Sequence, residues 1–171
     1  YEGYPGLLPG VFADQVAQEW RFTRTPYGPL SLQLQHDIVR LAGFHPYWSA
    51  VMMRIPALVG VVLIGVFLPR LARRTGHDAS FAAWFGVLNP LLVVDFVGGA
   101  HNDSFMMGLM VFGLWLATTA SWAWIPAALV IGASAAVKQP AVMAAVALPF
   151  IVHPMPSWRP RHVVTALGRV V

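Results

Sequence analysis

Apolar residues fall into five runs in the second part of the chain, and a polar, turn-rich stretch precedes them. The first 48 residues are rich in Gly, Pro, aromatic and polar side chains, and Thr25–Pro29 (Thr-Pro-Tyr-Gly-Pro) is typical of a turn. The pattern after this stretch predicts five helices, at Val51–Leu68, Phe81–Val97, Phe105–Ala117, Trp124–Val137 and Ala141–Val152.

The first loop contains a candidate amphipathic helix. Leu30, Leu34, Ile38 and Leu41 recur at helical spacing and would form one apolar face, with amide and charged side chains between them. Such a helix lies along a membrane surface or packs on protein. The pattern alone leaves both open.

Composition indicates that lipid surrounds most of the chain. Of its 171 residues 57% are hydrophobic and 11% are charged, and the mean hydropathy is +0.63. The 7 acidic and 11 basic residues are too few to cover a soluble domain of this size. The net charge is +4, but the basic residues form short clusters between apolar runs, which argues against a nucleic-acid partner.

We therefore predict an all-α polytopic membrane protein in three parts. Residues 1–48 form part of an extracytoplasmic loop, 49–153 about five transmembrane helices, and 154–171 a cytoplasmic loop and the start of a further helix. A bilayer core needs about 20 helical residues, so the shorter runs include flanking residues, tilt little or contain one re-entrant segment. The chain opens without Met and stops in an apolar run, so we expect it to be a fragment.

Basic clusters orient the predicted helices. Arginines at 70–74 follow the first apolar run, and arginines at 159–161 follow the fifth. Basic residues favour the cytoplasmic side. With both clusters there, residues 98–104 and Lys138 fall on the extracytoplasmic side together with the first loop. Polar residues between the runs thus gather on one face, which indicates a site there.

A polar turn, Gly98–Ser104 (Gly-Gly-Ala-His-Asn-Asp-Ser), interrupts the apolar sequence. His101, Asn102 and Asp103 place an imidazole, an amide and a carboxylate within one turn, a combination suited to binding sugar hydroxyls. The alternative is a helix cap, because Asn102 or Asp103 is a suitable first residue for the helix that follows. Spacing leaves cap and site open, although Asp95 nearby favours the site, since an intramembrane carboxylate needs a partner.

Two basic residues lie near outer helix ends. Lys138, followed by Gln139-Pro140, could bind a lipid phosphate or extend to lipid headgroups. Arg54 lies near the start of the first run, where an unpaired guanidinium is costly, so we expect an acidic or phosphate partner for it. Tyr27 in the Pro-rich turn offers a ring face to a sugar. The chain has no cysteine and no histidine pair with ligand spacing on one helix face, so no metal site is predicted.

Several stretches together carry a family resemblance. Asn89–Leu92 (Asn-Pro-Leu-Leu), followed by Val97–Asp103 (Val-Gly-Gly-Ala-His-Asn-Asp), resembles the actinobacterial polyprenol-phosphate-mannose-dependent alpha-1,6-mannosyltransferases of the GT-C superfamily. Thr25–Leu30 is similar to the turn that ends the first large extracytoplasmic loop of that family. Lys138–Pro140 is similar to a basic motif at the outer end of a later helix. These stretches occur in the family's order across most of the chain.

The resemblance implies a GT-C-like transmembrane helix bundle, present here in part, in the cell membrane. Such an enzyme transfers mannose from a polyprenyl phosphate to a growing alpha-1,6-mannan or lipomannan acceptor on the extracytoplasmic face. Its partners would be membrane lipid, the lipid-linked donor and the mannan-type glycolipid. No cofactor is implied, and a metal is not required in principle, since cationic side chains can stabilise the leaving phosphate.

The resemblance also implies roles for particular residues. The general base is expected to be an acidic residue early in the first extracytoplasmic loop, upstream of this segment, which takes the acceptor proton in a single displacement. His101 and Asp103 are the candidate catalytic residues within the chain. The candidate substrate-binding residues are Asn102, Lys138, Gln139, Arg54 and Tyr27.

Two other functions compete with this one. A transferase of the same superfamily could use another polyprenyl-phosphate sugar, such as an arabinose donor, and nothing in the sequence separates the two. A transporter or flippase would instead line a pathway with Asp95, His101 and Asp103, but it predicts inverted repeats, which the sequence does not show. A purely structural membrane subunit leaves the one-sided polar cluster unexplained.

Overall fold

The computed structural model describes residues 4–90 and 92–152. All regular secondary structure in these residues is helical, which confirms the predicted all-α class. The α-helices are α1 (Val11–Asp14), α2 (Pro29–Leu41), α3 (Pro46–Met52), α4 (Arg54–Arg74), α5 (Ala79–Val87), α6 (Asp103–Ala117), α7 (Trp124–Val137) and α8 (Met143–Val152). A π-helix (Leu92–Gly98) and three 3-10 turns, at Pro5–Leu7, Gln18–Trp20 and Gln139–Val142, complete the set.

Within residues 4–90 and 92–152, one helix is long and apolar enough to cross a membrane. Helices α3 and α4 join into a 29-residue unit, Pro46–Arg74, with a mean hydropathy of 2.4 over its most apolar window. Helix α5 and the π-helix would make a second span if they are counted together across their 53° bend. Among the described residues the remaining apolar helices are shorter than 18 residues. The predicted number of spans therefore stays a prediction.

One proline divides a predicted run into two helices, and two others lie where a helix tolerates them. Pro56 and Pro126 fall in the first turns of α4 and α7, where the missing N–H has no helical partner to lose. Pro90 falls inside the predicted run of residues 81–97, and there the helix divides into α5 and the π-helix. Proline disfavours the helical conformation of the residue before it, which explains the division.

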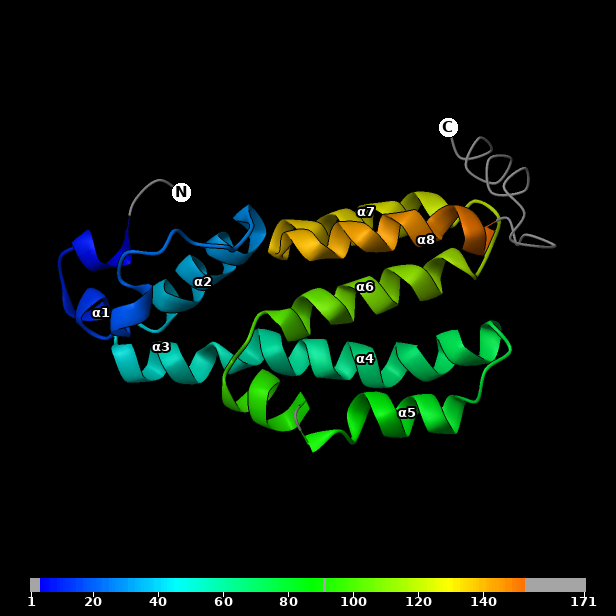
Figure 1. Cartoon of the computed structure of the whole chain (residues 1–171), viewed down its shortest axis with the longest axis horizontal. Helices are drawn as coiled ribbons and strands as arrows, with labels where there is room; N and C mark the ends of the chain where they lie inside the picture. The colour runs from blue at the N-terminus through cyan, green and yellow to red at the C-terminus, as the bar shows by residue number, and fades with distance from the viewer. Residues whose placement is uncertain (1–3, 91, 153–171) are drawn as a thin grey trace.

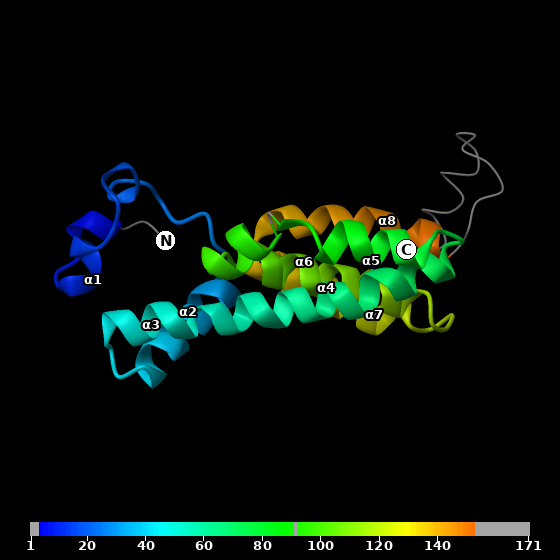
Figure 2. The same ribbon diagram turned by 90° about the horizontal axis from the view of Figure 1, so that it is seen from below.

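Helices α4, α6 and α7 pack side by side, with α5 on the far side of α4 (Figures 1 and 2). Glycines allow α4 and α6 to approach closely. A Cβ on Gly60 would lie 2.3 Å from the carbonyl of Ser104, and a Cβ on Gly108 would lie 2.7 Å from the carbonyl oxygen of Gly60. Small residues at such a crossing are typical of helices packed in lipid.

Serine hydroxyls tie the same helices together. The buried Ser104 donates to the carbonyl oxygen of Ala57 at 2.7 Å, and the buried Ser134 donates to that of Met106 at 2.7 Å. Each bond joins two helices, so α4, α6 and α7 are connected in series. The apolar core beside them consists of Ala117, Ala127, Ile131, Ala144 and Leu148.

The first loop lies at one end of this bundle (Figure 1). The amide of Gly28 donates to the carbonyl oxygen of Val137 at 3.0 Å, and a Cβ on Gly28 would lie 2.2 Å from the carbonyl oxygen of Ala136. Helix α2 begins directly after this contact and packs against α7. The loop is thereby fixed to the end of α7 by its backbone.

The predicted helix of residues 30–41 forms, but its packed face differs from the predicted one. Ser31 and Ile38 are the buried residues of α2, whereas Leu41 is 77% exposed. The helix therefore packs on protein through a face that includes small and polar side chains. The leucine spacing alone did not identify that face, because Leu30 and Leu41 remain exposed.

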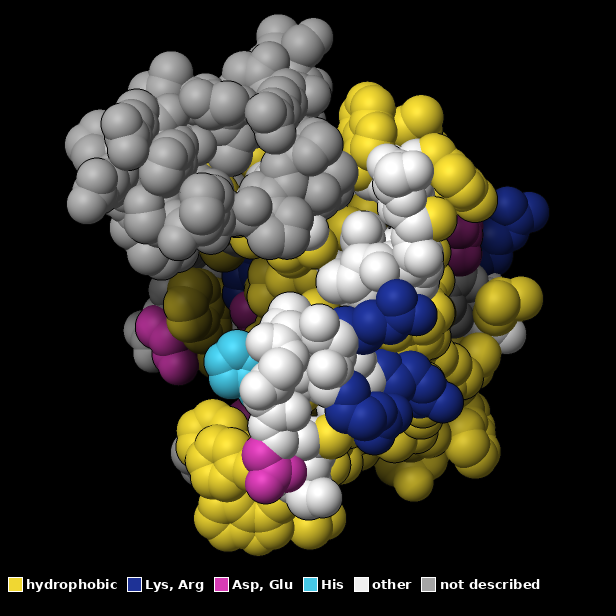
Figure 3. Space-filling model, turned by 90° about the vertical axis from the view of Figure 1, so that its right-hand side faces the viewer, with side chains coloured by type: hydrophobic (Ala, Val, Ile, Leu, Met, Phe, Trp, Pro, Cys, Tyr) yellow, Lys and Arg dark blue, Asp and Glu magenta, His cyan; other side chains and the backbone are white. Residues whose placement is uncertain are grey.

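The opposite end of the bundle is basic. Arg73 and Arg74 end α4, with Arg70 one turn earlier, and Figure 3 shows Lys and Arg side chains gathered on this end. Arg74 donates to the carbonyl oxygen of Thr118 at 3.0 Å, which joins the ends of α4 and α6. The predicted second cluster, at residues 159–161, and the rest of the predicted 154–171 segment lie outside the described residues.

We expect Gly60→Ala to destabilise the protein strongly. The added methyl would meet backbone atoms of α6, which cannot move aside as a side chain can, and overpacking of this kind costs about 1–3 kcal/mol or more. Thermal unfolding of the full-length protein in detergent measures the effect. Gly132→Ala in α7 is the matched control, since its Cβ would meet nothing within 4 Å. Equal melting temperatures for the two variants would contradict this packing.

Candidate functional site

The Gly98–Ser104 turn connects the π-helix to α6. The amides of Gly99 and His101 donate to the carbonyls of the π-helix, at 3.1 Å and 3.0 Å. A Cβ on Gly99 would lie 2.6 Å from the carbonyl oxygen of Asp95, so the turn requires glycine there. Ala100 has a φ of 52°, a conformation that is uncommon for a residue with a side chain. The backbone is tightly constrained where the candidate residues begin.

Asp103 and Lys138 form an ion pair across two helix ends. Asp103 is the first residue of α6, and Lys138 follows the last residue of α7 in an extended conformation. The Lys138 Nζ atom lies 2.8 Å from both carboxylate oxygens of Asp103. The pair is about three-quarters buried, since the two side chains are 23% and 28% exposed. Residues 35 positions apart thus meet at the face where the sequence predicted a site.

The helix-cap alternative for this turn is wrong. Asn102 is the N-cap of α6 by position, but its side chain makes no capping hydrogen bond. It donates instead to the hydroxyl of Ser31 in α2 at 2.8 Å. Asp103 directs its carboxylate to Lys138. Both side chains therefore serve tertiary contacts, and the amino-terminal charge of the helix dipole additionally favours the carboxylate of Asp103.

Arg54 does not pair with a carboxylate. Its guanidinium donates to the carbonyl oxygen of Ala50 at 2.8 Å and to that of Gly98 at 3.0 Å. Of the two expected partners, the acidic one is not found within residues 4–90 and 92–152, where Arg54 forms no ion pair, and the phosphate partner stays a prediction. Carbonyls satisfy some of its donors but leave its charge uncompensated. A cation beside a cavity attracts an anion.

A cavity of about 380 Å³ lies between the loop, the start of α4 and the polar turn. Four of the predicted site residues line it: Tyr27, Arg54, His101 and Asn102. The Lys138 Nζ atom lies 5.9 Å from the centre of the Tyr27 ring, so the ion pair adjoins the cavity through that ring. The cavity thus offers a ligand an aromatic face, one cation and several hydrogen-bonding groups, with the ion pair behind the Tyr27 ring.

Two residues of α2 belong to this site although sequence reasoning missed them. Gln35 lines the cavity and donates to the hydroxyl of Ser31 at 2.9 Å. Ser31, only 2% exposed, therefore accepts hydrogen bonds from both Gln35 and Asn102. The sequence feature that could have identified them is their spacing of four residues on a predicted helix, which places both side chains on one face.

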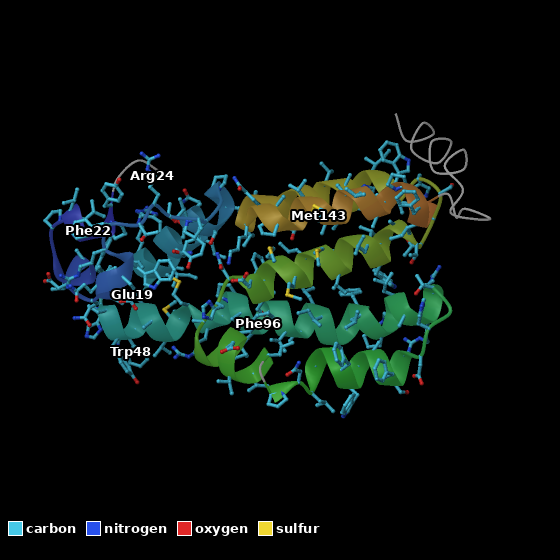
Figure 4. The ribbon with its side chains drawn as sticks, viewed as in Figure 1. Glu19, Phe22, Arg24, Trp48, Phe96 and Met143 are labelled. Carbon is cyan, nitrogen blue, oxygen red and sulfur yellow. The ribbon has the colours of Figure 1, made fainter. Side chains whose placement is uncertain are left out.

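Other predicted residues lie away from the cavity. Gln139 is exposed at the start of a 3-10 turn and does not line it. Asp95 lines a separate cavity of about 440 Å³ between α4, α5, the π-helix and α6, and only its backbone carbonyl contacts the polar turn, at the amide of Gly99. In the loop, Arg21 donates to the carbonyl of Val16 at 3.0 Å, and Arg24 lies at the outer edge of the loop (Figure 4).

Metal ligands do not gather in the described part of the chain. No group of three or more His, Cys, Asp or Glu side chains is placed there to hold an ion.

Comparison with known proteins places the chain in a family. Residues 1–155 match the family described as alpha-(1->6)-mannopyranosyltransferase, N-terminal domain. An alpha-(1->6)-mannopyranosyltransferase A of Corynebacterium glutamicum is 34% identical over 144 residues, 84% of this chain and 28% of the relative. An alpha-(1->6)-mannopyranosyltransferase of Mycobacterium tuberculosis is 41% identical over 104 residues, 61% of this chain and 18% of the relative.

The chain thus spans less than a third of these relatives. No solved structure matches it. Because the family match covers most of the chain and includes the cavity, the turn and the ion pair, the chain belongs to the alpha-(1->6)-mannopyranosyltransferase family.

Proposed function

We propose that the full-length protein transfers mannose from a polyprenyl-phosphate-mannose donor to a growing alpha-1,6-mannan or lipomannan acceptor at the extracytoplasmic face of the cell membrane. The observation that carries the proposal is the cavity of Tyr27, Arg54, His101 and Asn102 beside the Asp103–Lys138 pair. The relatives, named as mannopyranosyltransferases, support the transferred sugar. The donor, the acceptor and the membrane face are our inference from the chemistry of this cavity and from the residue pattern.

Arg54 is the best candidate for the donor phosphate. Its charge has no carboxylate partner among the described residues, and the two carbonyls it contacts hold the guanidinium at the cavity wall. A guanidinium can bind a phosphate through two parallel hydrogen bonds. As the bond between the anomeric carbon and the phosphate oxygen breaks, negative charge grows on the phosphate, and a fixed cation stabilises that transition state.

Lys138 and Asp103 act as a positioned pair. Because both carboxylate oxygens of Asp103 contact the ammonium, its first role is to hold Lys138 beside the cavity. The general base that takes the acceptor proton is then another carboxylate of the full-length protein. His101 lines the cavity and can bind a sugar hydroxyl or pass a proton. Tyr27 presents its ring to the sugar, while Gln35 and Asn102 supply amides.

The long helix supports a membrane setting for this site. The 29-residue α3–α4 unit reaches about 43 Å, more than the roughly 30 Å of a bilayer core. Because the start of α6 packs at Ala57 and Gly60 of α4, helix α3 extends beyond the end of α6 that carries Asp103 (Figure 1). A site set back in this way would admit a lipid-linked sugar from the membrane and an acceptor from outside.

We expect Asp103→Ala and Lys138→Ala each to lower mannose transfer by about 100-fold, because each change leaves the other charge without its partner and shifts the groups beside the cavity. Transfer from polyprenyl-phosphate-mannose to a short alpha-1,6-mannoside, in membranes carrying equal amounts of each full-length variant, measures this loss. If the residues act as a pair, the double variant loses little more than either single one.

Asp37→Ala is the control for the ion-pair variants, because Asp37 is an exposed carboxylate of α2 that contacts Gln33 and His36. It should transfer mannose normally. Normal transfer by both site variants would reject the proposed site. If the wild type transfers another polyprenyl-linked sugar but not mannose, the proposed mannose donor is rejected. If it transfers no polyprenyl-linked sugar, a transporter is favoured.

Cysteine labelling tests the proposed topology. In an otherwise cysteine-free full-length protein, Gln18→Cys in the first loop should react with a membrane-impermeant maleimide added to intact cells. His77→Cys, exposed after α4, should react only after the membrane is opened. Both positions are exposed, so a difference in labelling between them reports on which side of the membrane each one lies. Labelling of His77→Cys in intact cells would overturn the orientation.

A further inference from the structure

A second cavity adjoins the first and is not explained by the donor sugar. Its volume is about 540 Å³. It lies between the loop and the outer end of the long helix, and its lining includes Phe12, Gln15, Val39, Tyr47 and Ser49. Ala50 and Met53 line both cavities. The two cavities therefore adjoin at these two residues, on the same side of the first loop.

The lining combines aromatic rings with groups that form hydrogen bonds. Tyr47 is 65% exposed and Phe12 39% exposed, so both rings are available to a ligand. Gln15 adds an amide. The Ser49 side chain is only 3% exposed, and its hydroxyl has no hydrogen-bond partner in the described protein. Because that hydroxyl is buried, the groups within reach of a ligand are the two rings and the amide of Gln15.

The depth of this cavity favours a sugar over a lipid chain. If the basic residues that begin at Arg70 mark the inner boundary, counting about 20 residues back from Pro69 places the outer boundary of the bilayer core near Ala50. Tyr47 and Ser49 then stand outside the core. A prenyl chain has no reason to leave the lipid at this level, whereas a saccharide has to arrive from this side.

We propose that this second cavity is an acceptor subsite, which binds the mannose units of the alpha-1,6-mannan that precede the one receiving the new sugar. The inference rests on the proposed function, because it requires a saccharide acceptor at the first cavity. The ring of Tyr47 packs against a sugar face, while the amide of Gln15 binds hydroxyls. The enzyme would then prefer acceptors long enough to reach the subsite.

Direct binding tests the subsite without requiring transfer. An alpha-1,6-linked mannotetraoside is titrated into the purified full-length protein in lipid nanodiscs. Tyr47→Ala and Gln15→Ala should each weaken binding by about three- to tenfold, the scale of one ring or amide contact. Trp20→Ala and Gln18→Ala are matched controls, since both side chains are exposed in the same loop and line neither cavity. Unchanged binding by the cavity variants, or no binding by the wild type, would overturn the subsite.

Transfer kinetics separate this proposal from the proposed function. Tyr47→Ala should raise the KM for the tetraoside by about three- to tenfold, but change the KM for a dimannoside less than about twofold. An equal change for both acceptors, or a raised KM for the donor, would overturn the subsite while transfer itself persists. Wild-type protein that binds the tetraoside but transfers no mannose would overturn the proposed function and leave the saccharide site standing.

Discussion

The close contact between α4 and α6 determines the geometry of the rest of the molecule. At Gly60 and Gly108 the two backbones approach so closely that a methyl group on either residue would clash with the partner helix. Ser104 adds a buried hydrogen bond to α4 at the same level. Because Ser104 follows Asp103 directly, this contact fixes the start of α6 and so the place of the polar turn. Arg54, two turns before Gly60 on α4, reaches the turn for that reason.

Charge at the site is distributed unevenly, and this follows from the same packing. The ammonium of Lys138 has a carboxylate partner, whereas the guanidinium of Arg54 has only carbonyl partners among the described residues. The pair is close to neutral as a unit, and its energy depends on both members being present. The uncompensated charge lies at Arg54. An incoming anion is therefore attracted to the α4 side of the cavity more than to the α7 side.

The sequence predicted those features of the structure that depend on one residue type with one strong preference, such as apolar residues for helices buried in protein or lipid. Apolar runs located the helices, and the arginines at 70–74 lie at the end of the bundle opposite the polar turn. The meeting of Asp103 with Lys138 was only indirectly predicted, through their placement on one face. The other features of the site result from packing between helices that are distant in the sequence. The carbonyl partners of Arg54, the separate cavity at Asp95 and the contact of Ser31 with Asn102 all depend on contacts that no local pattern contains.

The π-helix before the polar turn has a consequence for how the family can vary in length. A π-helical turn accommodates one more residue than an α-helical turn between the same two ends. Residues 92–98 are wound in this way, and the amides of Gly99 and His101 donate to the carbonyls of Val94 and Phe96, each five residues back. A deletion of one residue there would let the segment close as an α-helix and would move these carbonyls away from the amides that begin the polar turn. Insertions and deletions among relatives should be tolerated in the loop but not in this segment.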